Sequence, residues 1–255
     1  MRVGQVVLVK AGPFLLVLAL WQLLPQLGLI KPLFLPALSV VIKTLIEITL
    51  SGKLGQNFIA TLYRIAIGLG LGASAAIIVG LIIGLSRPLR QFTMPLVAAS
   101  YPLPKIAMLS LFLVWFGLGD PPIIAILSLS AFYPMLLNTL TGVLTVDDTL
   151  IKAAYNMGAN YRQVLTKVVL PGALPVIFGG FRIAASVSLL VVVAVEMYIA
   201  NNGIGYLLAW ATQWYKMDLL YANIIVIGLF GILLFKLIQF AEKKIVPWKE
   251  KMVEG

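Results

Sequence analysis

The chain of 255 residues contains no cysteine and no histidine. These absences exclude a disulfide framework, a thiolate nucleophile and a histidine metal site, and they leave no imidazole for acid–base chemistry. Charged residues are also scarce, at 11% of the chain, whereas a soluble domain carries about 25%. Hydrophobic residues make up 61%, and the mean hydropathy is +1.04. The composition therefore predicts an integral membrane protein.

Long charge-free stretches run over residues 11–30, 65–86, 121–146 and 219–235. Each is close to the roughly 20 residues that a helix needs to cross the hydrocarbon core. A membrane β-barrel would instead show segments of about 10 residues with alternating polarity, and the chain lacks them. The sequence therefore predicts an all-α membrane protein with six spans, at about 11–30, 62–85, 93–117, 121–144, 174–200 and 218–240.

The net charge of +10 would suggest a nucleic-acid partner in a soluble protein. In a membrane protein, basic residues instead concentrate in cytoplasmic loops, so no nucleic-acid partner is expected. With the N-terminus inside, the cytoplasmic residues are Arg2, Lys10, Arg87, Arg90, Lys152, Arg162, Lys167, Lys236, Lys243, Lys244, Lys249 and Lys251. The outer residues are Lys31, Lys43, Lys53, Arg64 and Lys216, while Lys105 and Arg182 fall within spans. This asymmetry predicts an N-in, C-in protein with an uncleaved first span.

Two segments depart from a simple span. Residues 39–50 carry apolar residues at helical spacing, with Lys43 and Glu47 four apart, which indicates an interfacial helix on the outer surface or a connecting helix packed on the bundle. In the third predicted span, Pro102 and Pro104 precede Lys105. Proline interrupts a helix, so this span is expected to be bent or split.

The second predicted span carries a small residue at every fourth position, which leaves one helix face almost without side chains. Another backbone can approach such a face closely. The face builds either a subunit interface or a contact inside one chain. Its residues are Gly68, Gly72, Ala76, Gly80 and Gly84.

The loop 147–171 between the fourth and fifth spans has its own helix signals. Asp147, Asp148 and Thr149 supply capping oxygens at a helix start, and Gly158 can end that helix in the left-handed conformation. Asn160 and Gln163 can cap a second short helix, which Leu170 and Pro171 are expected to end. The pattern predicts two short helices on the cytoplasmic side, which either dock a partner or seal the bundle.

The run Lys152-Ala-Ala-Tyr-Asn-Met-Gly158, followed by Val168-Val-Leu-Pro171, resembles the EAA loop of ABC importer permeases, E-A-A-x3-G-x9-I-x-L-P. Val168 replaces Ile, and Lys152 replaces Glu. Further stretches resemble the nitrate/sulfonate/taurine type, from about residue 35 onward. They are Leu35-Pro36, Leu111-Phe-Leu-Val-Trp-Phe-Gly-Leu-Gly119, Val192-Val-Ala-Val-Glu-Met197, Gly203-Ile-Gly-Tyr206 and Val226-Ile-Gly-Leu-Phe-Gly231.

The resemblance implies a type I ABC importer core, which works as a pair of permease chains, expected to be a homodimer, in the inner membrane. An ATPase dimer would bind at the cytoplasmic side and a solute-binding protein at the outer side. The single permease domain would comprise an N-terminal span (1–34), an outer amphipathic segment (35–61), core spans (62–240) containing the coupling loop (147–171), and a cytoplasmic tail (241–255). The coupling residues would be Lys152, Ala153, Ala154, Tyr155, Met157, Gly158, Leu170 and Pro171.

The chain contains no G-x-x-x-x-G-K-[ST] phosphate loop. We therefore expect no catalytic residue and no bound cofactor or metal on this chain, with ATP and Mg²⁺ held by the partner ATPase. The reversed charge at Lys152 is expected to be matched by an acidic or neutral surface on the cognate ATPase, unless this side chain simply extends to water.

Charges within a span usually face a cavity or pair with each other. Arg182 and Glu196 lie 14 residues apart on the fifth predicted span, about 21 Å by helix rise, which is too far for direct pairing within one chain. They are candidates for the translocation path together with Ser186 and Ser188. Arg182 could attract an anionic solute, whereas for Glu196 a structural or gating role near Asn201 and Asn202 is favoured.

Two other functions would require residues that this chain lacks. A secondary transporter would need internal repeats and ion-coupling carboxylates in its spans. An intramembrane enzyme would need paired acidic groups or histidine. The chain has neither of these sets of features. A permease of another type I subfamily stays open. The sequence leaves the solute undecided among nitrate, sulfonates, taurine, bicarbonate and vitamin precursors.

Overall fold

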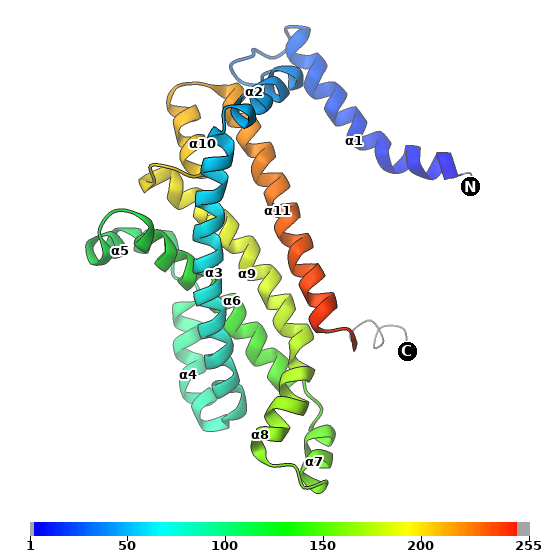
Figure 1. The fold of residues 1–255 in the computed structure, drawn as a ribbon, viewed down its shortest axis with the longest axis vertical. Helices are drawn as coiled ribbons and strands as arrows, with labels where there is room; N and C mark the ends of the chain where they lie inside the picture. Colours follow the sequence, from blue (N-terminus) through cyan, green and yellow to red (C-terminus); the bar gives the residue numbers. More distant parts are fainter. Residues whose placement is uncertain (1–2, 249–255) are drawn as a thin grey trace.

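The computed structural model describes residues 3–248, and every regular element in that range is a helix (Figure 1). Four helices are long and apolar enough to cross a membrane: α3 (Lys53–Leu85), α6 (Asp120–Leu144), α9 (Leu170–Ile199) and α11 (Met217–Ile245). The other helices are α1 (Val3–Gln26), α2 (Leu38–Leu50), α4 (Arg87–Ser100), η1 (Lys105–Met108), α5 (Leu109–Phe116), α7 (Asp148–Asn156), α8 (Tyr161–Val164), η2 (Leu165–Val169) and α10 (Ile204–Gln213). The predicted all-α membrane class is confirmed.

The described residues contain four spans by length and composition, or five when the bent pair of α4 and η1–α5 counts as one. The first predicted span, residues 11–30, corresponds to α1, whose apolar part, Gly12–Gln26, is shorter than a full span. Figure 1 shows α1 leaving the bundle at an angle rather than lying along it. The predicted cytoplasmic residues Arg2, Lys249 and Lys251 lie outside the described residues.

The small-residue face of α3 packs against α6 within the same chain. A Cβ on Gly68 would lie 2.5 Å from Cβ of Leu127, and a Cβ on Gly72 would lie 2.2 Å from the backbone oxygen of Ser128. Further along, Gly80 faces Thr139 and Gly84 faces Val143 in the same way. Close approach of backbones gains van der Waals contact, which drives helix association where no water is present to expel. This face therefore builds a contact inside one chain.

We expect Gly72→Ala to destabilise the chain and Gly70→Ala to leave it intact. The added methyl on Gly72 would collide with the backbone of α6, at a cost of about 3 kcal/mol, the upper end of overpacking effects. Gly70 lies on the same helix with open space around its Cβ position, so its substitution controls for helix propensity. Thermal unfolding of the detergent-solubilised variants measures both. Equal midpoints would contradict the close packing of α3 on α6.

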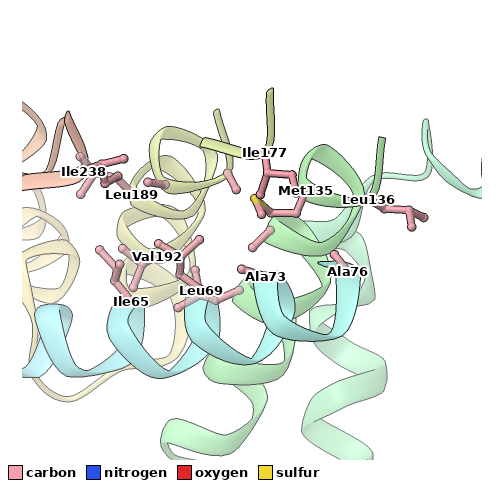
Figure 2. Close-up of a cluster of buried hydrophobic side chains, with 14 of the residues drawn as sticks. Ile65, Leu69, Ala73, Ala76, Met135, Leu136, Ile177, Leu189, Val192 and Ile238 are labelled. Carbon is pink, nitrogen blue, oxygen red and sulfur yellow. The ribbon is translucent and has the colours of Figure 1, made fainter. Parts of the chain in front are cut away.

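Side chains from the four long helices form a common core, which Figure 2 shows in close-up. Ile65, Leu69, Ala73 and Ala76 of α3 lie on one side of it, at 5% exposure or less. They face a set from the other helices that consists of Met135, Leu136, Ile177, Leu189, Val192 and Ile238. The core therefore fixes α3, α6 and α9 against one another, with α11 packed on α9.

The third predicted span breaks where the prolines predicted it to break. α4 ends at Ser100, η1 begins at Lys105, and the two halves are inclined by 85°. Pro102 and Pro104 lie in the intervening turn, where a missing N–H and the fixed φ of proline prevent the helix from continuing. The bend turns η1 and α5 away from the axis of α4 (Figure 1).

α2 forms over the predicted residues and packs on the bundle. Val41 is fully buried, and the Thr44 hydroxyl donates to Asp218 of α11 at 2.8 Å. The predicted pair of Lys43 and Glu47 is present at 3.9 Å between exposed side chains. α2 lies at the end of the bundle opposite α7 (Figure 1). The contacts correspond to the connecting-helix interpretation and are compatible with a place at the membrane surface.

Candidate functional site

α7 and the turn after it form the tip of the molecule at one end of the bundle (Figure 1). Asp147 caps α7, because its carboxylate accepts from the Thr149 N–H at 2.7 Å. This backbone hydrogen bond is the main cause that lowers the pKa of Asp147 below its usual value, and the nearby charge of Lys152 adds to it. The cap thus works best with the ionised carboxylate, next to the positive end of the helix dipole.

The two alanines of the motif lie on different faces of α7. Ala154 is buried against its own chain at 7% exposure, whereas Ala153 faces outward. Met157 is 83% exposed and Tyr155 is 46% exposed, while Lys152 is exposed as well. Large apolar groups on a solvated helix tip mark a surface suited to protein contact. One face of α7 therefore packs on the bundle, and the other face is exposed at the surface.

The turn after α7 has the predicted geometry. Gly158 has φ +83°, and its N–H donates to the carbonyl of Tyr155 at 2.9 Å. Asn160 and Gln163 then form a complete capping box at the start of α8, with backbone-to-side-chain bonds of 2.8 and 2.9 Å. These local bonds hold the tip in one shape, because they give partners to backbone N–H groups at the helix ends that no helical carbonyl can reach.

The prediction that Leu170 and Pro171 end the second short helix is wrong. Residues Tyr161–Ile199 form one continuous helix of 39 residues, comprising α8, η2 and α9. η2 is a π-helical turn in which the Leu170 N–H donates to the carbonyl of Leu165, five residues back. A proline ring collides with the carbonyl four residues earlier in a regular α-helix, and the wider π turn before Pro171 provides room for it. The helix that follows the tip therefore continues without interruption into α9.

A buried ion network ties α3, α6 and α9 at the other end of the bundle. Arg64, 4% exposed, pairs with Glu196 at 2.6 Å and with Asp120 at 2.7 Å. Glu196 is fully buried and also accepts from the Thr61 hydroxyl at 2.9 Å. Opposite charges in contact offset the cost of removing each from water. Arg64, which was expected on the outer side, therefore lies within α3 and faces inward, toward the two carboxylates that it contacts.

The same network holds the loop between α9 and α10. The Gly205 N–H donates to Glu196 at 2.9 Å, and the Arg64 guanidinium donates to the Asn202 carbonyl at 2.8 Å. Nearby, the Gly203 N–H donates to the side chain of Asn57 at 2.7 Å. These bonds satisfy backbone groups that would otherwise be buried without a partner. Sequence reasoning missed Arg64 as the partner of Glu196, and Asp120 as the second partner of Arg64, because these residues lie far apart in the sequence.

Arg182 lies far from Glu196, as its sequence distance predicts, and pairs instead with Glu242 of α11 at 3.2 Å. Arg182 and Ser186 line a groove of about 560 Å³ between α9 and α11. Ser186 donates to the carbonyl of Arg182 within its own helix at 3.0 Å, whereas Ser188 is fully buried away from this groove, and its hydroxyl lacks a partner among the described residues. The structure therefore separates the four candidate path residues into different environments.

Known proteins similar to this chain are permease subunits of transport systems. The family model described as "Binding-protein-dependent transport system inner membrane component" matches residues 68–249. The taurine transport system permease of Escherichia coli is 34% identical over 247 residues, which cover 95% of this chain and 90% of the relative. The formylaminopyrimidine transport permease of Halalkalibacterium halodurans is 30% identical over 93% of this chain and 94% of its own length.

Solved structures show the same fold at low sequence identity. A chain of the MetNI methionine ABC transporter aligns with a TM-score of 0.59 and 22% identity, over 73% of this chain and 91% of its own length. A chain of an amino acid ABC transporter aligns with a TM-score of 0.57 and 15% identity, over 74% of this chain and 92% of its own. The helical core described above is therefore the transmembrane fold of these transporters.

Proposed function

This chain belongs to the family of binding-protein-dependent transport system inner membrane components, as a nitrate/sulfonate/taurine-type ABC importer permease, and we propose that the α7 tip is where it receives force from its ATPase. The chain is a multi-pass membrane subunit without catalytic activity of its own. Its transport is driven by ATP hydrolysis on a separate subunit, and its solute arrives on a binding protein.

The observation that carries the proposal is the division of α7 into two faces. The inner face packs through Ala154 onto the chain, and the outer face offers Ala153 and Met157 to a partner. The small side chain of Ala153 lets the wall of a partner groove approach the helix, while the Met157 side chain can fill a pocket in it. Because a short turn joins α7 to the continuous helix of α8, η2 and α9, a push on α7 would be transmitted to α9.

We further propose that two copies of this chain form the pore and that ATP and Mg²⁺ bind to the partner ATPase. The membrane orientation would be N-in and C-in, which puts the α7 tip and the basic end of α11, with Lys243 and Lys244, on the cytoplasmic side. The end that carries α2 and α10 would then face the binding protein. Closure and reopening of the ATPase dimer would alternate access to a path lined in part by α9, for a small polar or anionic solute.

Co-expression with an ATPase subunit tests the coupling proposal. We expect the cognate ATPase to co-purify with the tagged permease in mild detergent and to hydrolyse ATP in that complex. An ATPase whose own permease carries Glu at the position of Lys152 should assemble less well, and Lys152→Glu should restore it, because the charge at this position has been reversed. Absence of any co-purified ATPase would contradict the proposal, and equal assembly of both ATPases would remove the role of Lys152.

A further inference from the structure

The break between α4 and η1 opens a cavity that the coupling mechanism does not use. It has a volume of about 370 Å³ and lies between the broken helix, α6 and α9. Its polar groups are contributed by the break and by α6: Lys105, Tyr101, Tyr133 and Ser130. Its opposite wall is apolar and consists of Val187 and Val191 of α9. The cavity therefore combines one cation and several hydroxyls with an aliphatic wall.

The positive charge of Lys105 is not balanced by a carboxylate in this cavity. Its ammonium lies 5.0 Å from the ring centre of Tyr101 and 4.8 Å from that of Tyr133, and it donates to the Tyr101 carbonyl. Among residues 3–248, no acidic side chain forms an ion pair with it. Two buried or half-buried cations of the bundle, Arg64 and Arg182, both have carboxylate partners. Unpaired charge within a span is costly and marks a functional site.

A second observation in the same cavity points to a ligand. Ser130 lines the cavity and is 3% exposed, and its hydroxyl has no hydrogen-bond partner among the described residues. A buried hydroxyl without a partner costs free energy that a bound acceptor would recover. The other serine of α6, Ser128, donates to the carbonyl of Ile124 in its own helix at 2.8 Å. Ser130 thus has an unused hydroxyl donor beside the cavity.

The depth of the cavity limits what can occupy it. Ser130 lies ten residues after the start of α6 at Asp120, which corresponds to about 15 Å along the helix axis. This is about half of the roughly 30 Å hydrocarbon thickness. Phosphates of lipid head groups lie outside that layer. An occupant with negative charge at this depth would therefore be a transported solute.

We propose that Lys105 and Ser130 form a binding station for the anionic head group of a small organic solute, a sulfonate or carboxylate with a short aliphatic part. Lys105 supplies the charge, the Ser130 hydroxyl donates a hydrogen bond, and Val187 and Val191 contact the aliphatic part. This inference rests on the proposed transport function and specifies the solute class of that same path.

Thiol labelling tests the station directly, because the native chain has no cysteine. Leu103 lines the cavity and is 52% exposed, so Leu103→Cys places one thiol beside Lys105. The probes are 2-sulfonatoethyl methanethiosulfonate, which is anionic, and its trimethylammonium counterpart, which is cationic. We expect the anionic probe to be favoured, and Lys105→Met to lower the ratio of the two rates about tenfold, the size expected for one charge a few ångströms away in a partly desolvated cavity.

Three matched changes complete the experiment. Lys105→Arg should keep the ratio, and Lys53→Met, which removes an exposed charge at the start of α3, should leave it unchanged. Millimolar ethanesulfonate should slow labelling by both probes, and Ser130→Ala should weaken that protection. A thiol that reacts with neither probe, a ratio unaffected by Lys105→Met, or an absence of protection by ethanesulfonate would each overturn the station.

The labelling is measured on the permease purified together with its ATPase, and the amount of ATPase is recorded for each variant. If the ATPase still co-purifies but the ratio of the two labelling rates does not change with Lys105→Met, the station alone is refuted. Loss of the ATPase from the unmodified permease would refute the coupling proposal, whatever the labelling ratio.

Discussion

Gly158→Arg is expected to remove the ATPase from the purified permease, whereas Gly52→Arg is expected to retain it. Both glycines have a left-handed backbone, with φ +83° and +76°, and neither has an atom within 4 Å of its Cβ position. The cost of placing an L-residue in this conformation, about 1–2 kcal/mol, is therefore shared. The difference is location: Gly158 follows α7 at the tip, whereas Gly52 lies between α2 and α3. α2 is at the end of the bundle opposite α7 (Figure 1).

The expected loss of co-purified ATPase is at least about tenfold. A long charged side chain in the centre of an interface blocks close packing, and central contact positions commonly contribute 2 kcal/mol or more to binding. The readouts are the ATPase-to-permease ratio after affinity purification and the ATP hydrolysis of the eluate. Retention of ATPase by both variants would refute docking at the tip. Loss from both would indicate that strain at a left-handed glycine, rather than the interface, is responsible.

Arg64→Met is expected to have the largest effect on stability. It would leave Glu196 fully buried beside Asp120 without the cation that both contact. Removing one partner of a buried pair typically costs about 3–5 kcal/mol. For a chain of this size, that corresponds to a fall of about 10 °C in the unfolding midpoint. The loop that the Arg64 guanidinium and Glu196 hold, around Asn202 and Gly205, should lose its protection against amide exchange.

The matched comparison uses Lys43→Met, which breaks the exposed pair with Glu47 and should change stability by less than about 1 kcal/mol. The double variant Arg64→Met with Glu196→Met should recover part of the loss, because it leaves no unpaired charge at the position of Glu196. Thermal unfolding in detergent and hydrogen exchange over residues 200–206 measure both effects. An Arg64→Met midpoint equal to that of Lys43→Met would show that the network does not stabilise the fold.

Local rules predicted the parts of the structure that depend on a few neighbouring residues. The Asp147 cap, the left-handed Gly158 and the Asn160–Gln163 capping box follow from hydrogen bonds that span four residues or fewer. The break after Ser100 follows from the missing N–H groups of the prolines in 101–104. Such interactions form wherever the same few residues occur, so they can be predicted without knowing the fold.

The same rules failed at a proline that the backbone accommodates and at side chains whose partners are distant in the sequence. Proline at position 171 predicts a helix end, but a π turn before it allows the helix to continue into α9. The charge count placed Arg64 on the outer side but assigned it no partner, because only the packing of α3 against α6 and α9 brings Asp120 and Glu196 beside it. Likewise, nothing in the sequence distinguishes Ala153 from Ala154 until α7 is packed on the bundle.

The sequence by itself determined that the chain is a helical membrane protein with a glycine-lined helix and a structured loop resembling the EAA loop. Hydrophobicity, helix periodicity and capping are properties of short segments, and they survive in any arrangement of the helices. Only the tertiary structure decided which side chains pair, which face of α7 is free, and that Lys105 and Ser130 share one cavity. Those outcomes depend on contacts between residues far apart in the chain, and such contacts exist only after the helices have packed.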